Sequence, residues 1–151
     1  MYYRACNRIS PSQINTNGLT HLNFAFASID PASFAVVPHN QLDVILYSEF
    51  TALKSKTLQT WIAIGGFDFN DPGITHTTFS DMVATPANRA AFIRSLIEFM
   101  ERWKFQGTDL DWEFPSQPNR GGRPEDTANL VSLVREMRAA FGTKYGLSSV
   151  L

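Results

Sequence analysis

The sequence has a single cysteine, no excess of charge of either sign and no long apolar run. One cysteine among 151 residues, Cys6, excludes an internal disulfide framework and a multi-cysteine zinc site. With 13 basic and 14 acidic residues, the chain offers no basic face for a phosphate backbone, so no nucleic acid partner is expected. No apolar stretch approaches the roughly 20 residues that cross a bilayer, so no membrane partner is expected, and the first residues lack the apolar core of a signal peptide. An uncharged or weakly charged ligand fits this composition better.

What remains is the composition of an ordinary globular protein. The hydrophobic share is 44%, and 151 residues are enough for one hydrophobic core. Both ends look cut, because the chain opens on the aromatic pair Tyr2-Tyr3 and closes on Gly146-Leu-Ser-Ser-Val-Leu151, which resembles a strand that has just begun. We therefore expect one part of a larger domain.

Short β-branched or aromatic runs alternate with segments of helical periodicity. The runs predict strands at residues 2–5, 19–29, 58–64, 105–112 and 147–151. Thr85-Pro86 supplies an N-cap and a first-turn proline for a helix, in which apolar residues recur at three- and four-residue spacing from Phe92 to Trp103. Two more helices are predicted at residues 124–141, with Gly142 placed to end the helix, and at residues 41–53.

The alternation of strands and helices predicts a parallel sheet with right-handed crossovers, in one of two architectures. An open doubly wound sheet normally has a glycine-rich phosphate loop after its first strand, but Asn7-Arg-Ile-Ser-Pro11 stands there instead. A closed (β/α)8 barrel needs about 250 residues, so this chain would cover a little over half of one. We predict the α/β class and the first half, strands 1 to 5, of a TIM barrel, with residues 1–151 as one partial domain.

The run Phe105-Gln-Gly-Thr-Asp-Leu-Asp-Trp-Glu-Phe-Pro115 has an acid at every second residue. On a strand, Asp109, Asp111 and Glu113 project to one side, and Leu110 and Trp112 to the other. The outer face of a barrel strand packs on helices, which suits the leucine and the tryptophan. The acids are therefore expected to point into the barrel near its C-terminal mouth, where barrel enzymes carry out their chemistry.

Three neighbouring acids raise one another's pKa, because like charges in a low-dielectric site disfavour ionisation. We expect one carboxyl of the row to keep its proton near neutral pH. Glu113 is the last on the strand and has the longest side chain, so it is the candidate proton donor to a ligand in the mouth. Asp109 lies deepest and is the candidate proton partner of Asp111.

The acidic row also fits a solvated surface or a metal site. Alternating acids often mark the solvated face of a surface strand, although the flanking helices and the apolar opposite face argue against this here. Paired aspartates also bind magnesium or manganese through oxygen, but no phosphate loop or basic residue for a phosphorylated substrate lies nearby in the sequence. We predict no metal and no cofactor.

The segment Asp109-Leu-Asp-Trp-Glu-Phe-Pro115 resembles the signature of family 18 glycoside hydrolases, the chitinases. Their D-x-x-D-x-D-x-E pattern lies on the fourth strand of a (β/α)8 barrel. Trp61-Ile-Ala-Ile-Gly-Gly66 resembles the S-x-G-G motif of their third strand, His21-Leu-Asn-Phe-Ala-Phe26 resembles the second strand, and Tyr2-Tyr3 the first. The similarity covers essentially the whole chain in the right order, and it is greatest to the fungal, killer-toxin-like branch.

The resemblance implies retaining, substrate-assisted hydrolysis of the β-1,4 linkages between N-acetylglucosamine units in chitin. Glu113 would protonate the glycosidic oxygen, and Asp111 would hold the 2-acetamido group, whose carbonyl is the nucleophile. Asp109 would share a proton with Asp111, and Tyr2 would hydrogen-bond near that pair. The family also implies a secreted or cell-wall location and a monomer at full length.

The sequence departs from the family pattern at two positions. Gln106 stands where the family has its first aspartate, and Ala63 stands where S-x-G-G has serine. Gln106 is offset by three residues from Asp109 and so faces the other side of the strand, where we expect a structural role. Ala63 removes a hydroxyl that would help to anchor Asp109, so proton sharing would rely more on Tyr2 or on water.

Aromatic residues and glycines near the mouth are the candidate sugar contacts. Aromatic rings stack on the apolar faces of pyranose rings, and Phe67 is the preferred one. Trp112 points toward the helices by parity and is expected in the core. Gly65 and Gly66 let the backbone approach a sugar, or simply form a tight turn out of a strand. The substrate-binding candidates are Tyr2, Phe26, Gly65, Gly66, Phe67, Trp112 and Phe114.

Two alternatives to a chitinase remain. The chain could belong to a chitin-binding lectin of the same fold, although such proteins usually lack the acid and Glu113 is present. It could also be a truncated fragment without function, because the family's remaining subsite walls come from strands six to eight, beyond Leu151. We expect the 151-residue chain alone to have little or no hydrolytic activity, because an open half barrel exposes sheet edges and half of the cleft.

Overall fold

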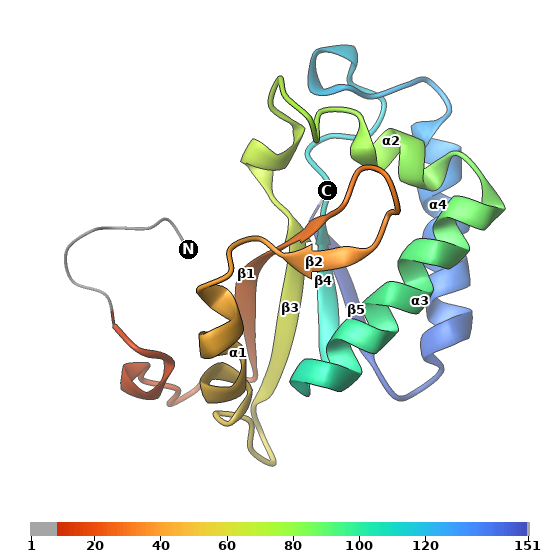
Figure 1. Cartoon of the computed structure of the whole chain (residues 1–151). Helices are drawn as coiled ribbons and strands as arrows, with labels where there is room; N and C mark the ends of the chain where they lie inside the picture. Colours follow the sequence, from red (N-terminus) through yellow and green to blue (C-terminus); the bar gives the residue numbers. More distant parts are fainter. Residues whose placement is uncertain (1–8, 151) are drawn as a thin grey trace.

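A computed structural model describes residues 9–150, in which strands and helices alternate along the chain (Figure 1). The strands are β1 (His21–Ile29), β2 (Val36–Pro38), β3 (Gln59–Gly65), β4 (Gly107–Asp111) and β5 (Gly146–Val150). The α-helices are α1 (Asp43–Thr51), α2 (Thr78–Val83), α3 (Pro86–Trp103) and α4 (Asp126–Phe141), and three short 3₁₀ turns are η1 (Pro11–Gln13), η2 (Phe67–Asn70) and η3 (Pro118–Arg120). The strand predicted at residues 2–5, which contains Tyr2, lies outside the described residues.

The strands form one sheet in the order β2-β1-β3-β4-β5. β1, β3, β4 and β5 are parallel, which confirms the predicted strand-helix organisation, and β2 pairs with β1 in the antiparallel direction. β2 and α2 were not predicted, because elements of three and six residues are too short to show a hydrophobic period. A turn held by Asp30 reverses the chain before β2, and the Asp30 carboxylate accepts hydrogen bonds from the backbone and hydroxyl of Ser33 at 2.8 and 2.7 Å.

The three predicted helices form at or near their expected ends. The Thr85 side chain caps α3 by accepting a hydrogen bond from the Asn88 backbone N–H at 3.1 Å, with Pro86 in the first turn. α4 ends at Phe141 and is followed by Gly142 with φ of 54°, as predicted, but begins at Asp126 rather than near residue 124. α1 covers the middle of the third predicted helix.

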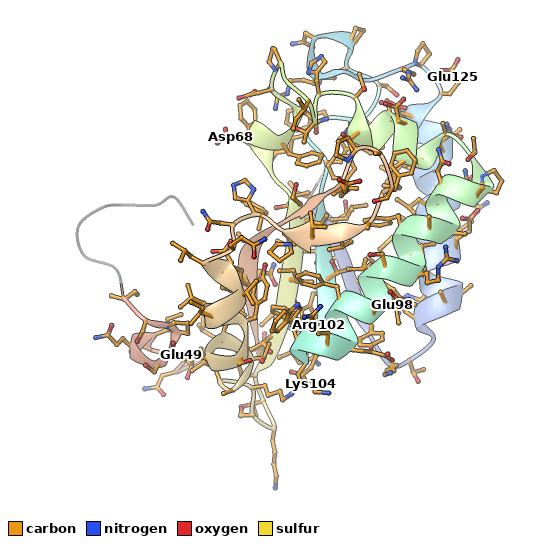
Figure 2. All side chains as sticks on the ribbon, viewed as in Figure 1. Glu49, Asp68, Glu98, Arg102, Lys104 and Glu125 are labelled. Carbon is orange, nitrogen blue, oxygen red and sulfur yellow. The ribbon has the colours of Figure 1, made fainter. Side chains whose placement is uncertain are left out.

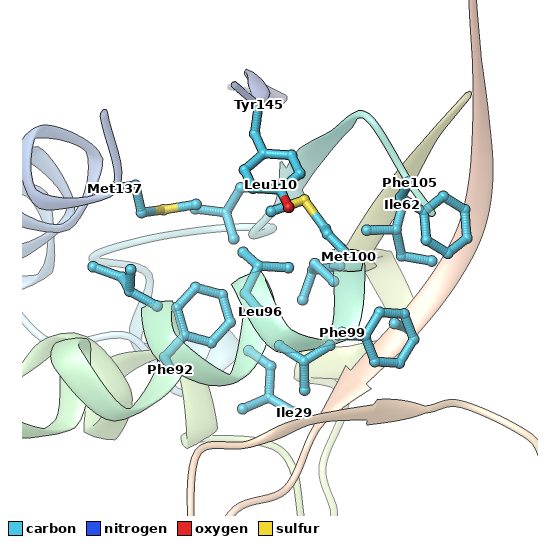
Figure 3. Close-up of a cluster of buried hydrophobic side chains, with 14 of the residues drawn as sticks. Ile29, Ile62, Phe92, Leu96, Phe99, Met100, Phe105, Leu110, Met137 and Tyr145 are labelled. Carbon is cyan, nitrogen blue, oxygen red and sulfur yellow. The ribbon is translucent and has the colours of Figure 1, made fainter. Parts of the chain in front are cut away.

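The hydrophobic core lies between the helices and one face of the sheet. Alternate residues of the strands, such as Ile62 and Leu110, are fully buried on this face. The apolar stripe of α3 packs against them, and Figure 3 shows Leu96 and Met100 near Leu110, with Met137 of α4 beside them. The pattern of alternation therefore sends the odd-numbered residues of β3 and β4 to the opposite face, which is the inside of a barrel.

On that inner face, Trp61 of β3 lies across two glycines of the neighbouring strands. Trp61 is in register with Gly107 on β4, and Gly107 with Gly146 on β5. A Cβ added to Gly107 would lie 2.5 Å from the indole, and one added to Gly146 would lie 2.0 Å from it. These two positions require glycine because the indole takes the space of a side chain, and the three residues together fill the end of the sheet opposite the loops that follow β3 and β4.

Each helix within residues 9–150 is too short or too polar to cross a lipid bilayer.

Candidate active site

The acidic row lies at the C-terminal end of β4, a strand in the middle of the sheet. Leu110 and Trp112 are 0% and 2% exposed on the core side, and Asp111, on the inner side, is 8% exposed. Asp109 and Glu113 are partly exposed. β4 lies between β3 and β5, and because Asp111 in the middle of the row is buried, the row is not a fully solvated face.

The Asp111 carboxyl keeps its proton to a higher pH than an ordinary aspartic acid does. Burial, followed by the charge of Asp109, a hydrogen bond with Asp109 and the charge of Glu113, raises the pKa of Asp111 to about 7. Its Oδ1 atom is buried and meets no hydrogen-bond donor within the described part of the chain. This geometry agrees with the expectation that one carboxyl of the row keeps its proton near neutral pH.

Asp109 has a hydrogen-bond donor on each of its carboxylate oxygens. Ser148 of β5 donates its hydroxyl to Oδ1 at 2.6 Å, and Asn23 of β1 donates its amide to Oδ2 at 3.2 Å. Sequence reasoning missed both donors. Ser148 is 39 residues and Asn23 is 86 residues from Asp109 in the sequence. Only the inward-facing strand positions of these two residues could have indicated the contacts, and using these positions requires the register of the strands. The two donors hold the Asp109 carboxyl in place beside Asp111, whose pKa is raised first by burial, so the proton of the pair is assigned to Asp111.

The structure shows the surroundings of both residues that depart from the family pattern. Gln106 joins β3 to β4, since its side-chain oxygen accepts the Thr60 backbone N–H at 3.2 Å and its own N–H donates to the Thr60 carbonyl at 2.9 Å. This confirms a structural role for Gln106. Ala63 is in register with Asp109 and supplies no hydroxyl, and the hydroxyl comes instead from Ser148 on the opposite neighbouring strand.

Gly65 and Gly66 form a tight turn at the end of β3, against the acidic strand. Their φ values are 97° and 90°, and the Gly66 N–H donates to the Asp111 carbonyl at 2.9 Å. A Cβ added to Gly65 would lie 2.5 Å from that carbonyl oxygen, and one added to Gly66 would lie 2.8 Å from the Phe26 ring. Close packing at this turn therefore requires both glycines, and Phe26 lies directly beside it.

The aromatic candidates divide between the core and the mouth. Phe67, at the start of η2, is 54% exposed and lies under the Arg120 guanidinium, 4.3 Å from ring centroid to Cζ. Phe114 is partly exposed. Trp112 as a sugar contact is wrong, because it is 2% exposed and its ring stacks on Phe79 of α2 at 5.2 Å. This confirms the expectation from strand parity that Trp112 belongs to the core.

The loops that follow β3 and β4 meet above the acidic row. In Figure 2, Asp68 of η2 and Glu125, just before α4, mark this end of the molecule, while Arg102 and Lys104 mark the opposite end. Within residues 9–150, no three His, Cys, Asp or Glu side chains are grouped as ligands for a metal ion. The arrangement can exchange a proton between neighbouring carboxyls and offer Glu113, past the end of the strand, to a ligand.

Comparison with known proteins agrees with this geometry. The model of the family "Glycosyl hydrolases family 18" matches residues 1–151. Chitotriosidase-1 of Mus musculus is 38% identical over 136 residues, which are 89% of this chain and 27% of the mouse protein. An endochitinase of Manduca sexta is 30% identical over 146 residues, which are 93% of this chain and 26% of the insect protein. The chain thus spans little more than a quarter of the length of these relatives.

Solved structures show the same fold. Catalytic domain 2 of the Group II chitinase of Ostrinia furnacalis superposes with a TM-score of 0.86 at 31% identity, over 95% of this chain and 38% of that one. A chitinase-like agglutinin of Robinia pseudoacacia superposes with a TM-score of 0.78 at 32% identity, over 93% of this chain and 42% of that one. The relatives named come from a mammal, insects and a plant, so the fungal, killer-toxin-like branch stays a prediction. The chain belongs to glycosyl hydrolase family 18, and its parallel strands form the first part of that family's TIM barrel.

Proposed function

We propose that these residues are the N-terminal part of a chitinase catalytic domain that hydrolyses β-1,4 linkages between N-acetylglucosamine units with retention. The observation that carries the proposal is the pair Asp109 and Asp111 on β4, in which burial raises the pKa of Asp111 to about 7, directly before Glu113 at the mouth. Support also comes from a related Ostrinia furnacalis Group II chitinase domain, 28% identical, which was solved in complex with the chitooligosaccharide (NAG)5.

Each acid has a distinct task in this reaction. Glu113 protonates the glycosidic oxygen while the carbonyl oxygen of the 2-acetamido group attacks the anomeric carbon, so the C–O bond to the leaving sugar breaks as an internal ring closes. Asp111 accepts a hydrogen bond from, and stabilises the charge on, that acetamido group. Asp109 takes up the Asp111 proton as this charge develops, and Ser148 and Asn23 keep Asp109 in place. Water then opens the ring, with the Glu113 carboxylate as base.

A chitin-binding lectin is the second candidate, and the likeness to the Robinia pseudoacacia chitinase-like agglutinin favours it. The lectin needs the sugar contacts of the mouth but no proton donor. Glu113, Asp111 and Asp109 together are more than binding requires, because burying like charges costs free energy. We therefore rank hydrolysis first, and we extend the proposal to the fungal, killer-toxin-like branch, a secreted or cell-wall location and a monomeric full-length protein.

Hydrolysis of a defined chitooligosaccharide by the full-length gene product that contains these residues tests the proposal. Proton NMR of the first products should show the β-anomer, because retention preserves the configuration of the bond that is cleaved. Glu113→Gln should lower kcat by about 100-fold to 10,000-fold, the usual contribution of a general acid, and should leave the Kd of the sugar within threefold.

Glu125→Gln is the matched control, since Glu125 is an exposed acid at the same end of the molecule (Figure 2). It should keep the kcat of the wild type. A full-length protein that binds the oligosaccharide without cleaving it would instead identify the lectin, and one that does neither would refute both candidates.

A further inference from the structure

Arg120 is a buried cation in the loop after β4, and the hydrolytic roles assigned above do not use it. It is 9% exposed at the end of η3, although arginine is rarely buried unless it is paired. Its partner in an ion pair is Asp71, whose side chain is half exposed. An arginine that served only solubility would be exposed to solvent. The buried guanidinium of Arg120 is therefore expected to hold other groups in place, and its contacts identify them.

Arg120 donates from all three guanidinium nitrogens to groups of both loops at the mouth. Nε donates to the backbone carbonyl of Glu113 at 3.0 Å. The other two nitrogens donate to the backbone carbonyl of Phe67 and to the carboxylate of Asp71. The same guanidinium lies over the Phe67 ring. One side chain thus fixes the peptide of the candidate acid and both the peptide and the ring of the exposed aromatic.

The loop that carries Arg120 is itself firmly held. Asp126, 1% exposed, accepts hydrogen bonds from the backbone of Arg123 and the hydroxyl of Ser80, both at 2.7 Å. Ser80 also donates to the Gly121 carbonyl at 3.0 Å, and a Cβ added to Gly121 would lie 2.1 Å from the His76 carbonyl oxygen. The loops after β3 and β4 are therefore in direct contact, and these contacts hold the backbone around Arg120 in place.

Planarity and the number of donors make arginine the residue suited to this place. Its fork of donors can reach two carbonyls and a carboxylate at once while its flat face covers a ring, and a lysine offers a single point charge. We propose that Arg120 is a positioning residue that sets the Phe67 ring relative to the Glu113 carboxyl, and so places the sugar next to the acid. This inference rests on the proposed function and concerns the residues that align the substrate for it.

Kinetics of the full-length gene product with a chitooligosaccharide test the inference. Arg120→Met should lower kcat/KM by about 10-fold to 100-fold, since a misplacement of about 1 Å can cost 100-fold. Arg120→Lys should stay within threefold of Arg120→Met, because it keeps the charge but not the fork. Arg89→Met is the matched control, since Arg89 is also a buried arginine, 7% exposed, but it joins α3 to Glu136 of α4 and to the Val83 carbonyl.

Combination with Phe67→Ala separates the two tasks of Arg120. In the Phe67→Ala background the effect of Arg120→Met on KM should shrink to less than twofold, while its effect on kcat, exerted through Glu113, should persist. All rates are compared at a temperature at which circular dichroism shows each variant folded. Hydrogen exchange should show faster exchange at residues 66–71 and 113–116 in Arg120→Met, but not in Arg89→Met.

Three results would overturn the inference. Hydrolysis by the wild type with the same kcat/KM in Arg120→Met and Arg89→Met would leave the proposed function standing and refute the positioning role alone. Recovery of wild-type kcat by Arg120→Lys would show that only the charge matters. A full-length protein that neither binds nor cleaves the sugar would refute the proposed function and, with it, the role of Arg120.

Discussion

The hydroxyl of Ser148 on β5 donates a 2.6 Å hydrogen bond to Oδ1 of Asp109 on β4. The register places Ala63 of β3 beside Asp109 on one side and Ser148 on the other. A hydroxyl that the family motif has on the third strand is therefore supplied here from the next strand along. The hydroxyl that holds Asp109 thus lies on the β5 side of β4 instead of the β3 side.

Removal of this hydroxyl should slow catalysis. Ser148→Ala should reduce kcat by about 10-fold to 100-fold, because a hydrogen bond to a charged group contributes about 1.5–3 kcal/mol. The double variant Ala63→Ser with Ser148→Ala should recover most of the rate, since the new hydroxyl again flanks Asp109. The measurement is the pH profile of kcat in the full-length protein.

Ser149→Ala is the matched control, because the neighbouring serine donates to the Leu110 backbone carbonyl at 2.9 Å and not to the acids. It should keep the wild-type profile. If Ser148→Ala also keeps the wild-type kcat and pH profile, the hydroxyl has no part in holding Asp109 for catalysis.

The raised pKa of Asp111 makes the stability of the folded protein depend on pH. Since the folded-state pKa is about 7 and the ordinary value is 3.8, the folded state binds more protons than the unfolded state between these values. The contribution of Asp111 to stability is therefore fully present below pH 4 and is lost as the pH rises through 7. Asp111→Asn should remove this dependence and stabilise the protein at pH 8 by about 1–3 kcal/mol, since each pKa unit corresponds to about 1.4 kcal/mol.

Thermal unfolding of the wild type and of Asp111→Asn at pH 5 and pH 8 measures this effect. The quantity to compare is the difference in Tm between the two proteins at each pH, because other titrating groups contribute equally to both. A difference that is the same at pH 5 and pH 8 would show that Asp111 is ionised throughout this range.

The turn after β3 should tolerate no side chain at Gly65. Gly65→Ala would place a Cβ 2.5 Å from the Asp111 carbonyl oxygen, so the acidic strand or the turn must shift. We expect the free energy of unfolding to fall by about 3 kcal/mol or more, because backbone strain at positive φ adds to the steric overlap of the new methyl group. Gly142→Ala separates the two causes, because Gly142 also has positive φ but open space at its Cβ, and only about 1–2 kcal/mol should be lost. Equal losses in urea unfolding of the two variants would mean that Gly65 has room for a methyl group.

The 151-residue chain tested alone should show little or no hydrolysis. The described sheet is open, with β2 at one edge and β5 at the other, so the described residues do not close a barrel around a cleft. The measurement is turnover of a chromogenic chitobioside by the purified chain, with the full-length gene product as the positive control. Turnover by the isolated chain at a comparable rate would show that the remaining strands are not needed for the reaction.

The sequence pattern was sufficient for the elements whose signals are local. Parity along β4 placed Leu110 and Trp112 in the core and the acids on the inner face, and Thr85 marked the start of α3. β2 could not be foreseen, because three residues leave no period.

The supporting residues of the site were beyond sequence reasoning for a different reason. Asn23, Ser148 and Arg120 contact their partners only after the strands are in register and the two loops have met. Ser148 and Arg120 are common polar residues outside any motif, and Asn23 lies within the segment that resembles the second strand but has no feature there that marks it as a partner of Asp109. The reacting groups are thus encoded locally, whereas the groups that hold them are encoded by the fold.

The indole of Trp61 lies over Gly107 and Gly146, so the residue that each of these three strand positions can accept depends on the other two. Any larger residue at either glycine must push out the ring, and a smaller residue at position 61 leaves a void that two glycines cannot fill. Single changes at these positions are therefore each costly, while a matched exchange of the tryptophan for a small residue and of a glycine for a bulky one conserves the volume. At the end of the barrel remote from the acids, substitutions at these positions are therefore expected to be tolerated in combination rather than singly. A library that varies residues 61, 107 and 146 together should yield folded variants that no single substitution reaches.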